Sequence, residues 1–383
     1  MCSELTLSPV FNLSMASKEL FHSNMLYWIS QSYPDLFLSV LTFLGIDTKS
    51  WGTEWTAFRE KDHFDLSICK KHTDQYLLIL ENKVKSIPTK HQLDEYTSKI
   101  KSTDNPQLLL LSLCTEFSQK EDIEQASWKI VSYADLSLAI RNVMMRINAP
   151  YHHALLDDYC LFIGYLHRMQ KNWSFKPNDS YLDTIVNTTP EIAKLEDVRK
   201  KVLISRMADS LLKSFPQAIF ANNKEIENKK DDVTPGQIYI YTGMSRTTAI
   251  LDIKIRITGN LLFVLQLQGD HFKHCIEVLG KNDINGINVV KSIKNYLKDN
   301  KGITLDQKME EIIIGSQYIS KGNRQGCQYG FEEREVTIPK AKEYNQYGES
   351  FVYQYVKINK EVTIGRILDV IQKNIEKITT LLK

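Results

Sequence analysis

The segment Tyr76-Leu-Leu-Ile-Leu-Glu-Asn-Lys83 decides the fold, because an apolar run with the length and composition of a buried strand ends in three polar side chains. Side chains alternate along a strand, so Glu81 and Lys83 share one face and Asn82 points to the other. Burying a carboxylate or an ammonium is costly unless a counter-charge, a metal or hydrogen bonds receive it. One face of this strand end is therefore expected to carry an acid and a base together.

The preceding segment supplies a second carboxylate. Asp65 comes directly before the short alternating run Leu66-Ser-Ile-Cys69, and the polar residues 70–75 form a turn before Tyr76. This pattern predicts a hairpin in which Asp65 and Glu81 converge. Two carboxylates at one point form a hard-oxygen site suited to Mg²⁺ or Mn²⁺, with Lys83 beside it.

These residues resemble the signature of the PD-(D/E)XK nuclease superfamily, in which an acid is followed, after a variable gap, by Asp or Glu, any residue and Lys. Here the signature is Asp65 and then Glu81-Asn82-Lys83. Gln92-Leu-Asp-Glu-Tyr96 resembles the QxxxY motif of the RecB-like branch, and Glu19-Leu-Phe-His22 is similar to the upstream helical Glu of the superfamily. No Pro precedes Asp65, which departs from the pattern that gives the superfamily its name.

The expected order of elements also fits that superfamily. The sequence predicts a helix near 18–30, strands near 53–60, 64–70 and 76–83, a helix near 89–101 and a strand near 107–113. This is an α/β fold with a restriction-endonuclease-like αβββαβ core and a mixed sheet, and the resemblance covers about the first 170 residues. Residues 107–113 are apolar on both faces, as a strand buried in a mixed or parallel sheet should be.

The resemblance implies a metal-dependent nuclease that hydrolyses phosphodiester bonds of nucleic acid, with DNA as the expected substrate. It implies that Asp65 and Glu81 hold Mg²⁺ or Mn²⁺ and that Lys83 orients or polarises the attacking water. Gln92 and Tyr96 would position the substrate backbone or the metal ligands. It also implies a bacterial or phage setting, with restriction or anti-phage defence as the role.

Two alternatives stay open. Glu19 would complete the site by resemblance, but an acid in the first turn of a helix is equally well explained by the helix dipole. A protein of another class, a non-cleaving nucleic-acid-binding or scaffold protein, could keep the same fold. Such proteins usually lose an acid or the Lys, and none is missing here.

Length and composition bound the architecture. A chain of 383 residues is long for one core, and its 43% hydrophobic and 25% charged residues are those of an ordinary globular protein. The polar stretch 171–190 predicts a boundary between a nuclease-like domain at 1–175 and an α+β domain at 190–383 that recognises a substrate or partner.

The net charge of +2 is too small to attract nucleic acid by itself, so binding would need a local basic patch. The candidates for such a patch are Lys83, Lys85, Lys90, Lys99 and Lys101. A solvated helix face explains these lysines equally well.

The second half predicts a helix from Thr189 to about 215, a charged surface loop at 222–235, and strands at 237–242, 247–257 and 261–268. A helix at 284–298, a β segment at 350–358 and a closing helix at 364–382 follow. The His/Cys-containing segment 269–275 is expected to be a loop between a strand and a helix rather than a metal site. Aromatic residues of this half are expected to be ordinary sheet residues rather than base-stacking ones: Tyr318, Tyr329, Phe331, Tyr344 and Tyr347.

The cysteines and the N-terminus indicate the compartment. The six cysteines contain no CxxC pair, so they signal neither a zinc site nor a disulfide framework. There is no signal-peptide pattern and no apolar run of about 18 residues. We therefore expect a soluble cytoplasmic protein without a membrane partner. Whether two copies pair into a homo-oligomer, whether DNA or RNA is cut, and whether single or double strands are cut stay open.

Overall fold

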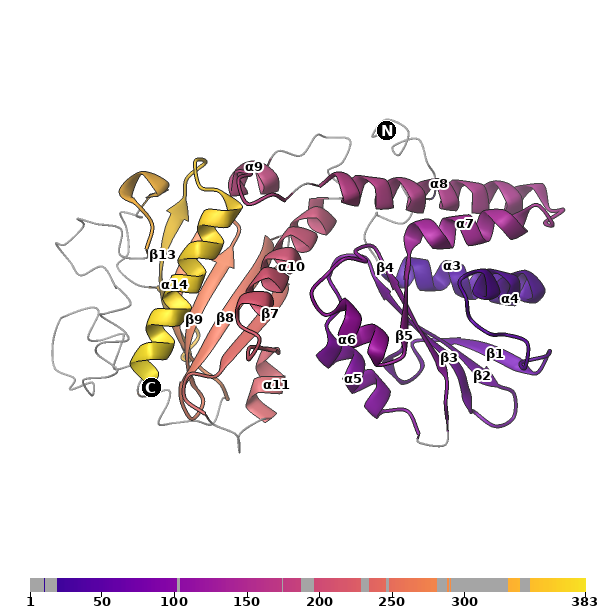
Figure 1. Ribbon diagram of the computed structural model, residues 1–383, viewed down its shortest axis with the longest axis horizontal. Coiled ribbons are helices and arrows are strands. Elements are labelled where there is room, and N and C mark those ends of the chain that lie inside the picture. The colour runs from indigo at the N-terminus through magenta and orange to yellow at the C-terminus, as the bar shows by residue number, and fades with distance from the viewer. Residues whose placement is uncertain are drawn as a thin grey trace. The chain divides into compact units, whose positions relative to one another are not determined.

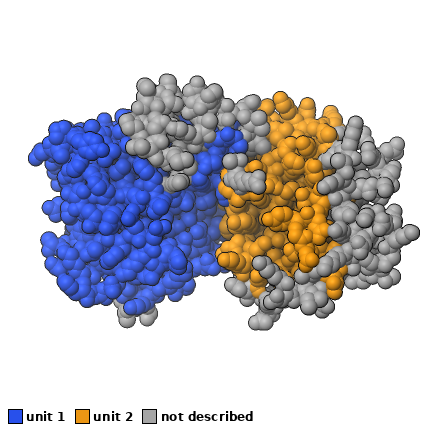
Figure 2. Space-filling model, turned by 180° about the vertical axis from the view of Figure 1, so that it is seen from behind, with its two compact units in different colours: residues 1–174, 188–202 blue, residues 175–187, 203–383 orange. Residues whose placement is uncertain are grey.

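The structure is a computed structural model (Figure 1). It describes residues 10, 19–101, 104–173, 175–186, 196–228, 234–245, 248–280, 288, 290, 330–337 and 345–383. The chain divides into two compact units, shown in different colours in Figure 2. Unit 1 consists of residues 1–174 and 188–202, and unit 2 of residues 175–187 and 203–383.

Unit 1 is built around a five-stranded mixed sheet. Its strands are β1 (Trp55–Arg59), β2 (Leu66–Lys70), β3 (Tyr76–Lys83), β4 (Gln107–Ser112) and β5 (Trp128–Ser132), and they lie in the sheet in this order. The first three are antiparallel, and β3, β4 and β5 are parallel. The predicted αβββαβ core with a mixed sheet is confirmed.

Helices cover both faces of this sheet (Figure 1). The helices described within residues 19–173 are α3 (Glu19–Ser32), α4 (Pro34–Phe43), the 3₁₀ turn η1 (Lys61–His63), α5 (Lys90–Ser98), α6 (Lys120–Gln125), α7 (Tyr133–Met144) and α8 (Pro150–Asn172), which packs on α7. On one face, Leu93 of α5 and Ile123 of α6 pack with Ile79 and Leu110 of the sheet in one hydrophobic cluster. The other face is covered by α3 and α7, which contact β1, β3 and β5. The end of β3 is therefore held between α3 and α5.

Unit 2 contains an eight-stranded sheet. In chain order its strands are β6 (Ile219–Phe220), β7 (Ile238–Ser245), β8 (Thr248–Thr258), β9 (Leu261–Gln268), β10 (His271–Val278), β11 (Val336–Thr337), β12 (Asn345–Tyr347) and β13 (Phe351–Ile358). Its helices are α9 (Tyr181–Val186), α10 (Glu196–Ser214, whose first turns belong to unit 1), α11 (Asn223–Asn228), the 3₁₀ turn η3 (Glu333–Glu335) and α14 (Ile364–Leu382). The strand order is β11-β13-β10-β9-β8-β7-β6, with β12 paired to β13.

One face of this second sheet carries the hydrophobic core of unit 2. The helices α10 and α14 run across that face (Figure 1), with Leu211 and Ile371 packed against Ile253 and Leu265. The side chain of Thr363 caps α14 by accepting a hydrogen bond from the backbone N–H of Arg366. The closing helix predicted at 364–382 and the β segment predicted at 350–358 are both present.

Two predictions for this half were wrong. The segment 269–275 is not a loop between a strand and a helix, because β10 begins at His271 and pairs with β9 along its whole length. Its alternating Phe272, Ile276 and Val278 are buried in the core, which a strand allows and a loop does not. The charged loop predicted at 222–235 contains the helix α11, where Asn222 and Glu225 exchange hydrogen bonds at the first turn.

Other predictions fall on residues outside the described ranges. These are the start of the helix at Thr189, most of the helix at 284–298, and the side chains of Tyr318, Tyr329 and Tyr344. Phe331 is buried in the core of unit 2, whereas Tyr347 is exposed. None of the helices in the described ranges combines the length and the apolarity that crossing a bilayer requires.

Candidate metal and catalytic site

The β2–β3 hairpin brings Asp65 and Glu81 side by side. Leu66 pairs with Leu80, so Asp65, one residue earlier, lies opposite Glu81, one residue later. The backbone N–H of Asn82 donates a 2.7 Å hydrogen bond to Oδ2 of Asp65 and fixes that carboxyl at the strand end. The two acids therefore converge, as the hairpin pattern predicts.

Glu81 and Lys83 form a buried ion pair on the α5 side of β3. Nζ of Lys83 lies 2.7 Å from Oε1 of Glu81, and the two residues are 6% and 3% exposed, respectively. The Tyr96 hydroxyl donates to the same oxygen over 3.2 Å. The other oxygen, Oε2, is buried and finds no hydrogen-bond partner among the residues that the structure describes. A buried carboxylate oxygen needs such a partner, so Oε2 is the atom best placed to bind a cation.

Gln92 and Tyr96 support this pair from α5. They are four residues apart on one helix face, and the Gln92 amide donates a 3.1 Å hydrogen bond to the Tyr96 hydroxyl. Gln92 thus orients Tyr96, and Tyr96 in turn holds Oε1 of Glu81.

Glu19 reaches the same strand end from the first turn of α3. Its Oε1 accepts a 3.1 Å hydrogen bond from the backbone N–H of Val84, the residue after Lys83. Its charge is also felt by both Asp65 and Lys83. Glu19 is therefore both part of the cluster and the first residue of α3.

The electrostatics of the cluster show an excess of negative charge. Burial, together with the neighbouring Glu81 and Glu19, raises the pKa of Asp65 to about 7 against the opposing effects of the Asn82 N–H and Lys83. Burial disfavours the ammonium of Lys83, but Glu81 and Glu19 outweigh this and hold its pKa above the usual range. Burial and Glu81 raise the pKa of Tyr96 to about 12, so its hydroxyl remains a donor.

These residues fit a divalent metal ion. Asp65 and Glu81 present carboxylate oxygens, which Mg²⁺ and Mn²⁺ prefer, and Oε2 of Glu81 is without a partner among the described residues. A cation between the two acids would also remove the repulsion that raises the pKa of Asp65. Asp65 and Glu81 are therefore the residues that would hold the ion.

The sequence patterns missed three contributors. The Asn82 amide donates a 2.5 Å hydrogen bond to the Ser23 hydroxyl and ties α3 to β3. Asp197, in the first turn of α10, forms a 2.6 Å ion pair with Lys85.

The third contributor is Lys201, one helical turn after Asp197. Burial is the main reason why the pKa of Lys201 falls to about 8, and the charges of Glu19, Lys85 and Lys83 also affect it. No local pattern could have indicated Asp197 or Lys201, because they are more than 100 residues from β3 in the sequence.

Other polar residues near β2 and β3 lie outside the cluster. Asp62, an acid three residues before Asp65, is exposed and accepts a hydrogen bond from the Tyr76 hydroxyl. Of the lysines considered for a phosphate-binding patch, Lys90 pairs with Asp94 and Lys99 lies over the Tyr96 ring at 5.5 Å from its centroid. Contacts of this kind are typical of a solvated helix face, and they do not by themselves form a continuous basic patch for phosphates.

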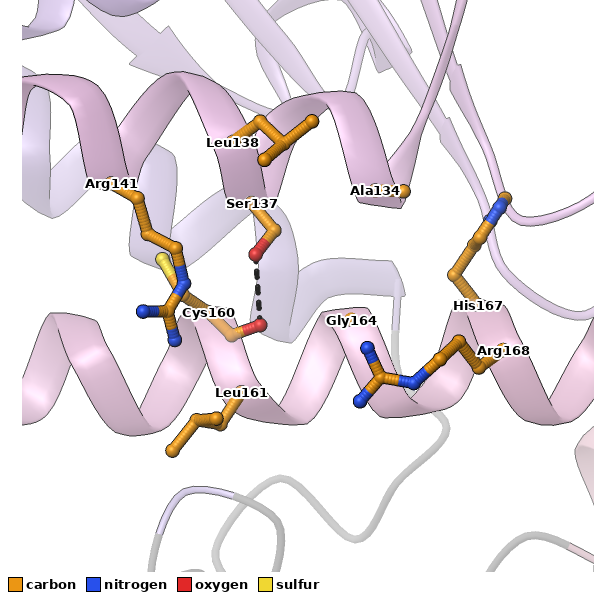
Figure 3. Close-up of a pocket in the computed structure, with 9 residues that line it drawn as sticks. All are labelled: Ala134, Ser137, Leu138, Arg141, Cys160, Leu161, Gly164, His167 and Arg168. Atoms are coloured by element: carbon orange, nitrogen blue, oxygen red, sulfur yellow. Dashed lines mark hydrogen bonds between the residues drawn. The ribbon is translucent and has the colours of Figure 1, made fainter.

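A separate hollow of about 390 Å³ lies between α7 and α8 (Figure 3). Arg141 and Arg168 border it, and the Ser137 hydroxyl within it donates to the backbone oxygen of Cys160 over 2.9 Å. No carboxylate lines this hollow. It therefore offers no hard-oxygen ligands of the kind found at the end of β3.

Comparison with known proteins agrees with this geometry. Residues 35–161 match the family model of the PD-(D/E)XK nuclease superfamily. The matched region contains β1 to β5 and most of the cluster, whereas Glu19 and Asp197 lie outside it. No curated protein and no solved structure matches the chain. Proteins of this superfamily are generally nucleases that use divalent metals, and the match supports a fold of this type for residues 35–161. The RecB-like branch and its QxxxY motif stay predictions.

Proposed function

We propose that this protein is a Mg²⁺- or Mn²⁺-dependent nuclease that hydrolyses phosphodiester bonds of nucleic acid, with DNA as the expected substrate. The observation that carries the proposal is the buried carboxylate of Glu81. Its Oε1 accepts hydrogen bonds from Lys83 and Tyr96, and its Oε2 has no hydrogen-bond partner among the described residues. The family match supports the same class of reaction.

Each residue of the cluster has a separate task in this proposal. Asp65 and Glu81 hold the metal. Lys83, fixed 2.7 Å from Oε1 of Glu81, donates hydrogen bonds to the attacking water and orients it toward the phosphorus. Tyr96 and Gln92 keep Glu81 in position, and Glu19 holds the backbone after Lys83. A bound divalent ion would stabilise the charge that develops on the phosphoryl oxygens and lower the pKa of a bound water.

The remaining parts of the proposal rest on the superfamily resemblance. They are a role in restriction or anti-phage defence and recognition of substrate or partner by the second half of the chain. A cytoplasmic location is also part of the proposal and rests on the cysteine pattern. We keep the division into a nuclease domain and an α+β domain as part of this proposal. The predicted bounds of this division are 1–175 and 190–383, whereas the first compact unit of the structure also includes residues 188–202.

The competing function is a non-cleaving nucleic-acid-binding or scaffold protein on the same fold. No observation favours it, since both acids and the lysine are present and in place. The experiment that separates the two is incubation of the purified chain with single- and double-stranded DNA and RNA in Mg²⁺, Mn²⁺ and EDTA. We expect cleavage of at least one substrate with a metal and none in EDTA. Binding without cleavage under every metal condition would overturn the nuclease and establish the alternative.

A further inference from the structure

A row of aromatic side chains lies along the face of the second sheet opposite α10 and α14, where its first two rings also pack at the edge of a smaller buried cluster that includes Val264 and Cys275. On β13, Val352 and Val356 are buried in the core of unit 2, and the alternating Phe351, Tyr353 and Tyr355 are half-buried on the other face. The ring centroids of Phe351 and Tyr353 are 5.7 Å apart, and those of Tyr353 and Tyr355 are 6.4 Å apart. The rings therefore form a continuous row rather than isolated contacts.

The row continues onto the neighbouring strand β10. The His271 ring lies 4.7 Å from the Tyr355 ring, and its imidazole contacts Asp270 at 2.7 Å. We call Phe351, Tyr353, Tyr355 and His271 the aromatic strip. The three rings on β13 recur at every second residue, about 6.6 Å apart along the strand. This spacing suits flat groups that an extended chain carries one after another.

Positive charge accompanies the aromatic strip. Lys273 pairs with Tyr355 in the sheet register, and its Nζ lies 5.0 Å from the centroid of the Tyr353 ring. The ammonium is hydrogen-bonded to the amide oxygens of Gln266, at 2.6 Å, and Gln268. Neutral amides orient this charge without cancelling it, although burial lowers the pKa of Lys273. The exposed Lys357 pairs with His271 in register at the end of the strip.

A hollow of about 410 Å³ opens over this region, and its lining includes Tyr353, Tyr355, His271 and Lys273, together with Gln268, Asp270 and Asn345. Nδ2 of Asn345 is buried and has no hydrogen-bond partner among the residues that the structure describes. The hollow thus combines flat aromatic walls, the Lys273 ammonium, amide groups that can donate or accept hydrogen bonds, and the Asp270 carboxylate, which pairs with His271. Small-molecule sites in proteins have this size and this mixture of groups.

We propose that the aromatic strip binds single-stranded nucleic acid, stacking bases on Tyr353 and Tyr355 and pairing Lys273 and Lys357 with phosphates. Aromatic rings bind bases of any sequence because every base has a π-face, and lysines beside them attract the backbone. Bases in a duplex are already stacked on one another, so the strip selects unpaired strands. The proposal does not depend on cleavage, because the strip belongs to unit 2 and shares no residue with the acidic cluster.

The test is fluorescence anisotropy of the full chain in EDTA, where metal-dependent cleavage is absent. The probes are labelled oligothymidylate and oligouridylate of about 16 nucleotides and a duplex of the same length. We expect both single strands to bind more tightly than the duplex. Tyr353→Ala and Tyr355→Ala should each weaken single-strand binding by roughly tenfold, the loss of one stacked base.

Two matched variants keep the test independent of folding. Tyr355→Phe retains the ring and should bind as the wild type does. Tyr151→Ala removes a 74% exposed tyrosine of α8 in unit 1, outside the sheet that carries the strip, and should change nothing. Unchanged binding in a folded Tyr353→Ala/Tyr355→Ala variant, no binding of single strands by the wild type, or a preference for the duplex would overturn the proposal. Cleavage activity in Mg²⁺ would be unaffected by that failure, and the two proposals are therefore judged separately.

Discussion

At the scale of single residues, the carboxyl group of Asp65 sets the pH dependence of the site. Its pKa is about 7 in the folded, metal-free protein because of burial and the neighbouring Glu81, and its ordinary value is 3.8. At a pH between these two pKa values, Asp65 keeps its proton in the folded state but has lost it in the unfolded state. Asp65 therefore makes the metal-free protein less stable as the pH rises through this window, and the effect is complete above about pH 7.

This shift leads to a prediction about metal affinity. A metal ion must displace the proton from Asp65, so the affinity for Mg²⁺ should rise up to about tenfold per pH unit below pH 7 and level off above it. Isothermal titration calorimetry across this range measures the slope directly. Asp65→Asn, which has no proton to lose, should bind the metal weakly and with less pH dependence. An affinity that is flat between pH 5 and 8 in the wild type would contradict the role given to Asp65.

The role of Lys83 can be separated from its charge. Lys83→Arg keeps the positive charge beside Glu81 but replaces a compact ammonium with a planar fork. If Lys83 orients the water, this variant should lose roughly 10²-fold or more in cleavage rate at nearly unchanged melting temperature and Mg²⁺ affinity. Lys83→Met should lose at least as much activity, and it should also melt earlier because it leaves Glu81 buried without its counter-charge. A Lys83→Arg protein that cuts at the wild-type rate would exclude the catalytic role.

The residues that the sequence predicts best are those whose positions follow from local geometry. Glu81 and Lys83 share a face because of strand alternation, and Asp65 meets Glu81 because a short polar turn closes the hairpin. The contacts of Asn82 with Ser23 and of Lys85 with Asp197 depend instead on how distant helices pack. No pattern of residue spacing in the sequence predicts such contacts, because the tertiary packing of the helices determines them.

At the scale of elements, the sequence predicts helices and strands well where one periodicity dominates. The closing helix α14 and the apolar strand β4 are examples. The strand β10 was missed because its polar residues, among them His271 and His274, follow Gly269 and favour a loop over the alternating apolar pattern of a half-buried strand. The helix α11 was missed because its residues are nearly all polar, and only the hydrogen bonds between Asn222 and Glu225 reveal its start.

The start of α7 provides an element-scale prediction. The Ser132 hydroxyl accepts a 3.1 Å hydrogen bond from the backbone N–H of Asp135, and the Asp135 carboxylate accepts one from the N–H of Ser132. Ser132→Ala removes half of this capping box and should lower the free energy of unfolding by about 1 kcal/mol. Ser98→Ala, at an exposed position at the end of α5, should change it by no more than about 0.5 kcal/mol. Urea unfolding monitored by circular dichroism measures both, and equal effects would show that the cap does not stabilise α7.

At the scale of the whole molecule, composition and length predicted two domains with a boundary between 175 and 190. The structure groups residues into two compact units and assigns 188–202 to the first. The ion pair between Lys85 and Asp197 illustrates why sequence alone could not place that segment, since the partners are 112 residues apart. Whether the units fold and act as separate domains stays a prediction.

The central claim concerns the whole chain as an enzyme: Asp65 and Glu81 hold a metal that makes it a nuclease. Its most direct test is the single-turnover cleavage rate as a function of Mg²⁺ concentration for the wild type, Glu81→Gln and Asp62→Asn. Asp62 is the matched control, because it is a nearby acid that contacts Tyr76 rather than the cluster. We predict metal-dependent cleavage by the wild type, a similar curve for Asp62→Asn, and a loss of at least about 10²-fold for a folded Glu81→Gln protein. Wild-type cleavage by Glu81→Gln, or cleavage by the wild type that persists in EDTA, would contradict the account.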